Sequence, residues 1–213
     1  MANLTTDSQH DALIGIDIQN DFCPGGALAV AEGDQVVART NALMTAFDRV
    51  VLTQDWHPAG HASFASRHDG ANPYDTVDAV YGPQTLWPDH CVQGTDGAAF
   101  HADLDIDRAE LVIRKGFQAE IDSYSALYEN DHATPTGLAG YLRDRGLKRL
   151  FMTGLATDFC VAYSALDARK EGFEVYVVDD ACRAIDLGGS LAAAWEQMTA
   201  AGVQRITSDA LID

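Results

Sequence analysis

Long apolar runs, basic side chains and closely spaced cysteines are all scarce in this sequence of 213 residues. No stretch approaches the length that spans a bilayer, and the polar segment from Met1 to His10 carries no secretory signal. We therefore expect a cytoplasmic protein with no membrane partner. Lys and Arg number 14 against 32 Asp and Glu, and the formal charge of -18 argues against nucleic acid as a partner. A small, neutral or weakly polar molecule fits this charge better.

The cysteines show no CxxC spacing that would indicate a redox pair. They are Cys23, Cys91, Cys160 and Cys182. Because the cytosol is reducing, structural disulfides are not expected, and each thiol is considered on its own.

Short apolar runs alternate with helical patterns along the chain. The runs predict strands over residues 12–18, 49–54, 111–114, 148–152, 173–178 and 203–207, and the helical patterns cover 34–47, 134–146, 161–172 and 191–201. This alternation predicts a three-layer α/β/α fold with a mostly parallel sheet of about six strands. A hydrophobic content of 47% suffices for one core, so we expect a single domain over residues 1–213.

Residues 55–110 interrupt the alternation and show no strong helical or strand pattern. The segment holds five of the seven histidines and four of the six prolines, together with Trp56 and Trp87. This composition is typical of a rigid, aromatic-walled lid rather than a flexible linker. We therefore predict a metal-site and lid insertion here.

Four polar side chains follow the first four predicted strands. Asp17, Asp55, Lys115 and Cys160 each stand where a strand ends, and ligands of parallel sheets bind at that edge. Taken singly, each has a simpler interpretation as a turn aspartate, a solvated lysine or a packed cysteine. Their convergence on one edge favours an active site.

Cys160 is the predicted nucleophile. It stands at the start of the helix predicted after residue 160, where backbone N–H groups and the helix dipole favour a thiolate. The sequence thus predicts a lowered thiol pKa. The same N–H groups could hold an oxyanion.

A metal site is predicted within the insertion. Asp55 and His57 alternate along an extended backbone and can point to one side, and His90 can complete the set. One Asp and two His suit a divalent ion, with Zn²⁺ first and Fe²⁺ or Mn²⁺ as alternatives. Ordinary surface histidines are the competing interpretation. His61 is left open as a further ligand.

Five motifs in this order resemble the isochorismatase-like hydrolase superfamily, and more closely its nicotinamidase/pyrazinamidase branch. They are DIQNDF at 17–22, DWH at 55–57, WPDHCV at 87–92, RKG at 114–116 and GLATDFC at 154–160. The resemblance covers nearly the whole chain, and the motifs are specific in combination.

The resemblance implies a catalytic triad of Asp17, Lys115 and Cys160. Cys160 would attack the carboxamide carbon of nicotinamide, Asp17 would carry the proton, and Lys115 would stabilise the charged pair. The N–H groups of Ala156 and Cys160 would form the oxyanion hole, with a cis peptide bond between Leu155 and Ala156.

The resemblance also implies how the ring is bound. A metal on Asp55, His57 and His90 would bind the pyridine nitrogen. The aromatic walls would be Phe22, Trp87 and Tyr124, for which core packing is the competing interpretation. Because the metal ligands and the nucleophile follow different strands, we expect mutation to separate metal binding from reactivity of the thiol, so that Asp55→Ala leaves Cys160 alkylatable.

The implied activity is hydrolysis of nicotinamide to nicotinate and ammonia through a cysteine thioester, in NAD salvage, with pyrazinamide as a second substrate. Another cysteine amidase of the superfamily, cleaving an N-carbamoyl group, would not need Asp55 and His57. An isochorismatase would lack Cys160. A non-enzymatic metal-binding protein would not need Lys115. The sequence leaves a homo-oligomer open.

Overall fold

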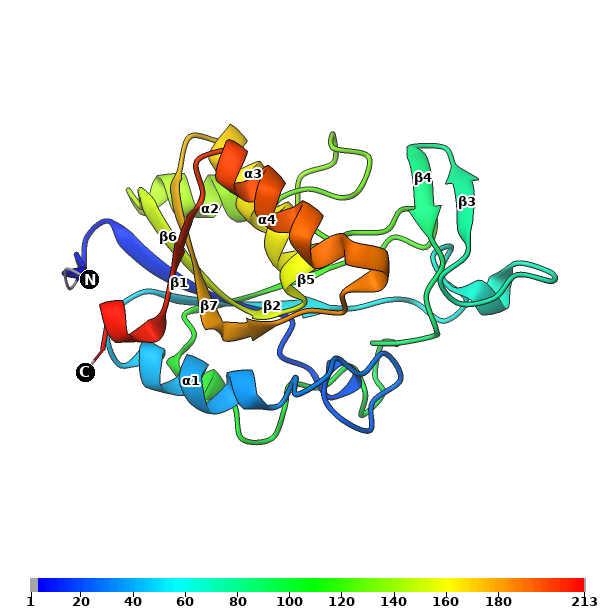
Figure 1. Ribbon diagram of the computed structural model, residues 1–213, viewed down its shortest axis with the longest axis horizontal. Helices are drawn as coiled ribbons and strands as arrows, with labels where there is room; N and C mark the ends of the chain where they lie inside the picture. Colours follow the sequence, from blue (N-terminus) through cyan, green and yellow to red (C-terminus); the bar gives the residue numbers. More distant parts are fainter. Residues whose placement is uncertain (1–3, 213) are drawn as a thin grey trace.

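The computed structural model describes residues 4–212 and contains a six-stranded sheet in the order β5-β2-β1-β6-β7-β8 (Figure 1). The strands are β1 (Asp11–Ile16), β2 (Val50–Asp55), β5 (Leu111–Lys115), β6 (Arg149–Leu155), β7 (Glu174–Arg183) and β8 (Gln204–Ile206). All five pairings in this sheet are parallel. The predicted parallel sheet is therefore confirmed.

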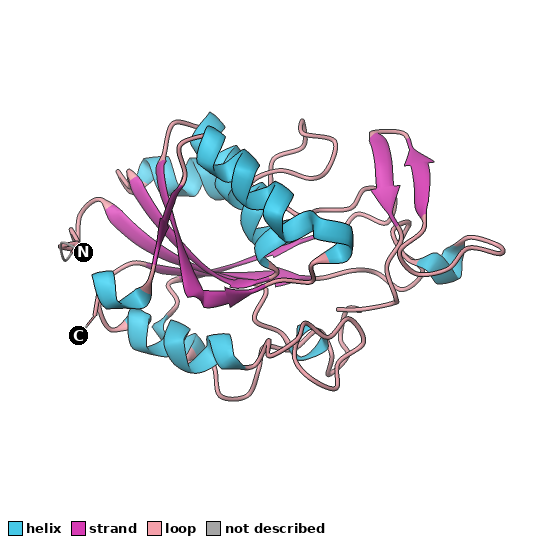
Figure 2. Ribbon diagram, viewed as in Figure 1, coloured by secondary structure: helices cyan, strands magenta, loops and turns pink. Residues whose placement is uncertain are grey.

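Helices cover both faces of the sheet (Figure 2). Helix α1 (Gln35–Met44) lies on one face, and α2 (Leu138–Asp144), α3 (Ala162–Lys170) and α4 (Ser190–Ala200) lie on the other. No helix among residues 4–212 is long and apolar enough to cross a membrane.

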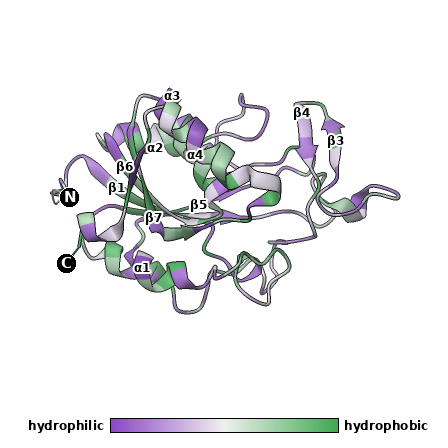
Figure 3. Cartoon of the chain, in the orientation of Figure 1, coloured by the Kyte–Doolittle hydropathy of each residue, from purple (hydrophilic) through white to green (hydrophobic). Residues whose placement is uncertain are grey.

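Alternation along β1 shows how the two cores are built. Ala12, Ile14 and Ile16 face the core of α2, α3 and α4, whereas Leu13 faces the core of α1. All six residues of β1 are buried because the strand lies inside the sheet with helices on both sides. Figure 3 shows hydrophobic residues along the strands and on the helix faces that meet them.

The segment between β2 and β5 contains a hairpin that the sequence pattern did not predict. Its strands are β3 (Thr76–Ala79) and β4 (Gly82–Thr85), which pair antiparallel at the end of the molecule away from both termini (Figure 1). The strands are short and mostly only partly buried, and proline, here Pro83, is unusual within a strand. The sequence therefore shows almost no alternation of apolar and polar residues in the hairpin. The organisation as one domain with an insertion at about 55–110 stays a prediction.

Helix α2 begins at Leu138, later than predicted from Thr134. Asp131 accepts hydrogen bonds from the backbone N–H and the hydroxyl of Thr134, and Thr136 donates to the carbonyl of Ala126. These bonds hold residues 134–136 in a loop. Gly137, with φ of 100°, then starts the helix.

The pairing of β6 with β7 becomes irregular near the polar edge of the sheet, where β7 carries extra residues. The register of β6 against β7 shifts between Met152 and Gly154, and Gly154 has φ of 112°. A Cβ at this position would lie 2.1 Å from the carbonyl oxygen of Ile16 on β1. Only glycine fits here, in backbone conformation and in space.

We expect Gly154→Ala to lower the free energy of unfolding by about 3 kcal/mol or more, because a side chain there meets backbone that cannot move aside. Gly140→Ala is the matched control, since Gly140 lies in α2 and a Cβ added to it would meet no atom within 4 Å. That change should stabilise the protein by about 0.5–1 kcal/mol. Urea unfolding of both variants measures this, and equal stabilities would contradict it.

Candidate active site

Four neighbouring strands bring the predicted polar residues to one edge of the sheet. Asp17 directly follows β1, Asp55 and Lys115 end β2 and β5, and Cys160 follows β6. These strands are consecutive in the sheet order β5-β2-β1-β6. The four side chains are buried and lie together, as the sequence predicts.

The ammonium of Lys115 lies at the centre of this group and is fully buried. Its Nζ is 2.8 Å from Asp17 Oδ2 and 3.0 Å from Asp55 Oδ1. It also donates to the carbonyl of Ser123 at 2.8 Å and lies 3.5 Å from Cys160 Sγ. Burial disfavours the charge, but the two carboxylates outweigh it and hold the pKa of Lys115 well above its usual value.

The carboxylate of Asp17 has one oxygen bound by a hydroxyl group and the other paired with the Lys115 ammonium. Thr53 donates its hydroxyl to Oδ1 at 2.6 Å. Oδ2 is buried beside Lys115 but receives no well-directed hydrogen bond from any described residue. Burial raises the pKa of Asp17, and Asp55 adds to this, while Lys115 opposes it. A carboxylate in this state is a better base than one in water.

The pKa of the Cys160 thiol differs from the prediction made from the sequence. Burial raises the pKa of Cys160 well above its usual value; Lys115 lowers it, while the Asp17 and Asp55 carboxylates raise it. The expected lowering is therefore wrong, because desolvation and two nearby negative charges outweigh the cation. Cys160 rests as a thiol and needs a base to become a nucleophile.

The turn that carries Cys160 also differs from the expected α-helix start. Residues Thr157–Val161 form a single π-helical turn before α3, with the N–H of Val161 donating to the carbonyl of Ala156 at 3.1 Å. Such turns are frequent at functional sites. The Leu155–Ala156 peptide bond is cis, as expected.

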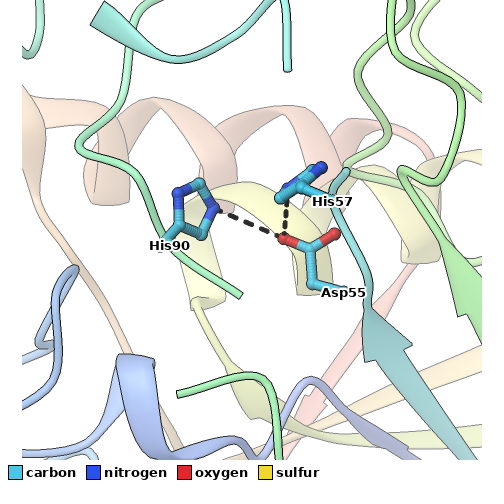
Figure 4. Close-up of side chains that lie close together, drawn as sticks. All are labelled: Asp55, His57 and His90. Atoms are coloured by element: carbon cyan, nitrogen blue, oxygen red, sulfur yellow. Dashed lines mark hydrogen bonds and ion pairs between the residues drawn. The ribbon is translucent and has the colours of Figure 1, made fainter. Parts of the chain in front are cut away.

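Asp55, His57 and His90 form the predicted metal-ligand group (Figure 4). Their ligand atoms lie within 4.8 Å of one another, with Nε2 of His57 3.0 Å and Nε2 of His90 3.5 Å from Asp55 Oδ2. Nδ1 of each histidine donates a hydrogen bond to a backbone carbonyl. The partner of His57 is Gly116 at 2.9 Å, and the partner of His90 is Pro88 at 2.7 Å. Nε2 of each histidine therefore faces Asp55 and could bind a metal in place of a proton, so the set fits a divalent metal.

His61 lies beside this group but is engaged elsewhere. Its ring packs 4.4 Å from that of His57. Nδ1 lies 2.8 Å from the Ser63 hydroxyl, and Nε2 lies 2.8 Å from the carbonyl of Gln118. Since Nε2 must donate to a carbonyl, it carries the proton and has no lone pair for a metal. His61 Nε2 is thus not offered to the Asp55, His57 and His90 group, although His61 also lies within ligand distance of His57 and Asp122.

A cavity joins the thiol to the metal-ligand group. It is lined by Phe22, Leu28, Asp55, Trp87, His90, Asp122, Tyr124, Ala156, Phe159, Cys160 and Ile185. All three predicted aromatic wall residues line it. Leu28, Asp122, Phe159 and Ile185 were not predicted, and of these only Phe159 lies within one of the five motifs.

Asp55 serves both halves of the site. Its Oδ1 accepts from Lys115, while Oδ2 faces His57 and His90. Asp55→Ala would therefore also remove a partner of Lys115, and the expectation that Cys160 stays alkylatable in this variant stays a prediction. His90 is the better residue for separating the halves, because its polar side-chain contacts among the described residues are only with Asp55 and Pro88.

The Isochorismatase domain family matches residues 11–210. The chain belongs to the isochorismatase family. A nicotinamidase of Acinetobacter baylyi is 58% identical over 197 residues, which are 92% of each chain.

Solved structures agree with this family assignment. A nicotinamidase/pyrazinamidase of Acinetobacter baumannii has a TM-score of 0.96 and 54% identity, covering 97% of this chain and 100% of its own. PnC1 of L. infantum, in complex with nicotinate, has a TM-score of 0.87 and 41% identity, covering 99% and 98%. A pyrazinamidase of Pyrococcus horikoshii, in complex with zinc, has a TM-score of 0.74 and 37% identity, covering 93% and 99%.

We expect His90→Ala to weaken binding of a divalent ion by at least about 100-fold, because it removes a direct ligand. Removing only a hydrogen-bond partner of a ligand already lowers metal affinity by about tenfold or more. Competition with a chromophoric chelator, using Zn²⁺ as the probe, measures this. His101→Ala is the control, since His101 lies outside the group. Equal Zn²⁺ affinities in the two variants would contradict the assignment.

Proposed function

We propose that the chain is an amidohydrolase that converts nicotinamide to nicotinate and ammonia, and pyrazinamide to pyrazinoate, in NAD salvage. The observation that carries this is the cavity itself, which presents the Cys160 thiol and the Asp55, His57 and His90 group to one bound molecule. A carboxamide on a nitrogen heterocycle has both matching parts. The related nicotinamidases support the assignment.

The first half of the reaction forms a thioester. Asp17 takes the proton of Cys160 on Oδ2, which is paired with the Lys115 ammonium but receives no well-directed hydrogen bond from a described residue. Lys115 stabilises the resulting thiolate. The thiolate attacks the carboxamide carbon, and N–H groups of Ala156 and Cys160 stabilise the oxyanion. The C–N bond then breaks, and Asp17 returns the proton to the departing ammonia.

The second half releases the acid. A water molecule gives its proton to Asp17, and its oxygen attacks the thioester carbon. The C–S bond breaks and the Cys160 sulfur recovers the proton from Asp17. Nicotinic acid leaves and ionises to nicotinate in water. Each proton that Asp17 accepts is returned within the same half-reaction, so the enzyme ends the cycle unchanged.

Asp55, His57 and His90 would hold one divalent ion, with Zn²⁺ first and Fe²⁺ or Mn²⁺ as alternatives. When bound, the ion supplies a Lewis-acid contact for the ring nitrogen. Phe22, Trp87 and Tyr124 then enclose the ring with apolar surface.

Two features weigh against the other interpretations. An amidase for N-carbamoyl groups has no use for two histidines whose Nε2 atoms converge on Asp55 beside the cavity. A metal-binding protein without activity has no use for a buried lysine between Asp17 and Cys160. We place the enzyme in the cytoplasm, acting on a small molecule.

We expect Asp17→Asn to lower kcat for nicotinamide by at least about a hundredfold while the fold is retained, because the amide keeps the shape but cannot accept the thiol proton. Ammonia release measures turnover, and circular dichroism checks the fold. Asp78→Asn, an exposed aspartate on β3, is the matched control and should match the unmodified protein. Near-normal turnover by Asp17→Asn would show that Asp17 is not the base.

A further inference from the structure

Gln84, on strand β4, binds several groups although only 2% of its surface is exposed. Its Nε2 is 2.8 Å from Asp122 Oδ2 and 3.0 Å from the hydroxyl of Tyr124. Its Oε1 accepts from the Tyr81 hydroxyl at 3.0 Å and from Asn130 Nδ2 at 3.3 Å. One amide side chain therefore joins the β3–β4 hairpin to residues 122–130.

The same two segments are joined by further bonds. The N–H of Asp122 donates to the Tyr81 hydroxyl at 3.2 Å. Asn130 closes the loop on itself, with its N–H donating to the Asp122 carbonyl at 2.7 Å and its Oδ1 accepting from the N–H of Tyr124 at 3.0 Å. We call Tyr81, Gln84, Asp122, Tyr124 and Asn130 the hairpin latch.

The loop held by the hairpin latch reaches the active site at two points. Tyr124 and Asp122 line the cavity, and the Tyr124 hydroxyl also accepts from the indole N–H of Trp87 at 3.0 Å. Between them in sequence, Ser123 gives its carbonyl to Lys115. The hairpin lies outside the cavity lining, yet it supports one aromatic wall and borders a contact of the buried lysine.

We propose that Gln84 is a positioning residue that fixes Tyr124 and Asp122 against the bound ring and so sets the affinity for the substrate. This inference rests on the proposed function. Gln84 touches none of the triad side chains and none of the metal-ligand group. Loss of the Gln84 amide should weaken binding of the substrate and of the transition state by the same amount. KM then rises and kcat stays almost unchanged.

Gln84→Leu tests the proposal, because leucine fills similar space but cannot bond to Asp122 or Tyr124. We expect KM for nicotinamide to rise about tenfold, the effect of losing one buried hydrogen bond to a charged group, with kcat within about twofold of normal. Val80→Thr is the control on the same hairpin, since Val80 is 99% exposed. It should leave both constants unchanged.

Tyr81→Phe repeats the test with a smaller change. If Gln84→Leu fails to fold, Tyr81→Phe tests whether the hairpin latch sets the affinity for the substrate. It removes one donor and one acceptor of the hairpin latch and should raise KM in the same direction. Unchanged KM in a folded variant, or a fall in kcat alone, would overturn the proposal.

Failure of the proposed function is a separate outcome, because unmodified protein would then release no ammonia from nicotinamide. Hydrogen exchange does not depend on turnover and tests the latch itself. The N–H groups of Asp122 and Asn130 should exchange faster in Gln84→Leu than in Val80→Thr. Equal exchange would show that Gln84 does not hold the loop.

Discussion

The buried ammonium of Lys115 is the constraint on which the rest of the site depends. Asp17 and Asp55 end neighbouring strands, and both are almost fully buried. Two such carboxylates repel each other and are costly to desolvate unless a cation lies between them. Lys115 is within 3.0 Å of both, and the Ser123 carbonyl takes a further ammonium hydrogen. The charges are thereby compensated inside the protein.

This arrangement explains how one cluster serves two kinds of chemistry. One oxygen of the Asp55 carboxylate pairs with Lys115, and the other faces the two histidines. Burial alone would raise the pKa of Asp55, but the positive charges of His57 and Lys115 hold it well below its usual value. Asp17, which lacks a histidine partner, has a raised pKa instead. Neighbouring carboxylates thus take different roles, one remaining ionised and the other exchanging a proton.

The positions of the site residues were predictable because they follow from topology. Apolar runs give the strands, and parallel strands bring their carboxyl ends to one edge, so Asp17, Asp55, Lys115 and Cys160 converge. The pKa of Cys160 was not predictable in this way. It depends on burial and on distances to Asp17 and Asp55, which a helix-start pattern does not contain. The contacts of Gln84 were not predictable from the sequence either, because they join a short hairpin to residues about 40 positions away in the chain.

If catalysis passes through Cys160, a covalent intermediate on its sulfur can be trapped. Unmodified protein would be mixed with nicotinamide, quenched in acid within the first turnovers, digested and analysed by mass spectrometry. We expect one nicotinoyl group on the peptide that contains Cys160, and none on the peptides of Cys23, Cys91 or Cys182. Rapid ammonia release with no acyl group on Cys160, at quench times that resolve single turnovers, would contradict it.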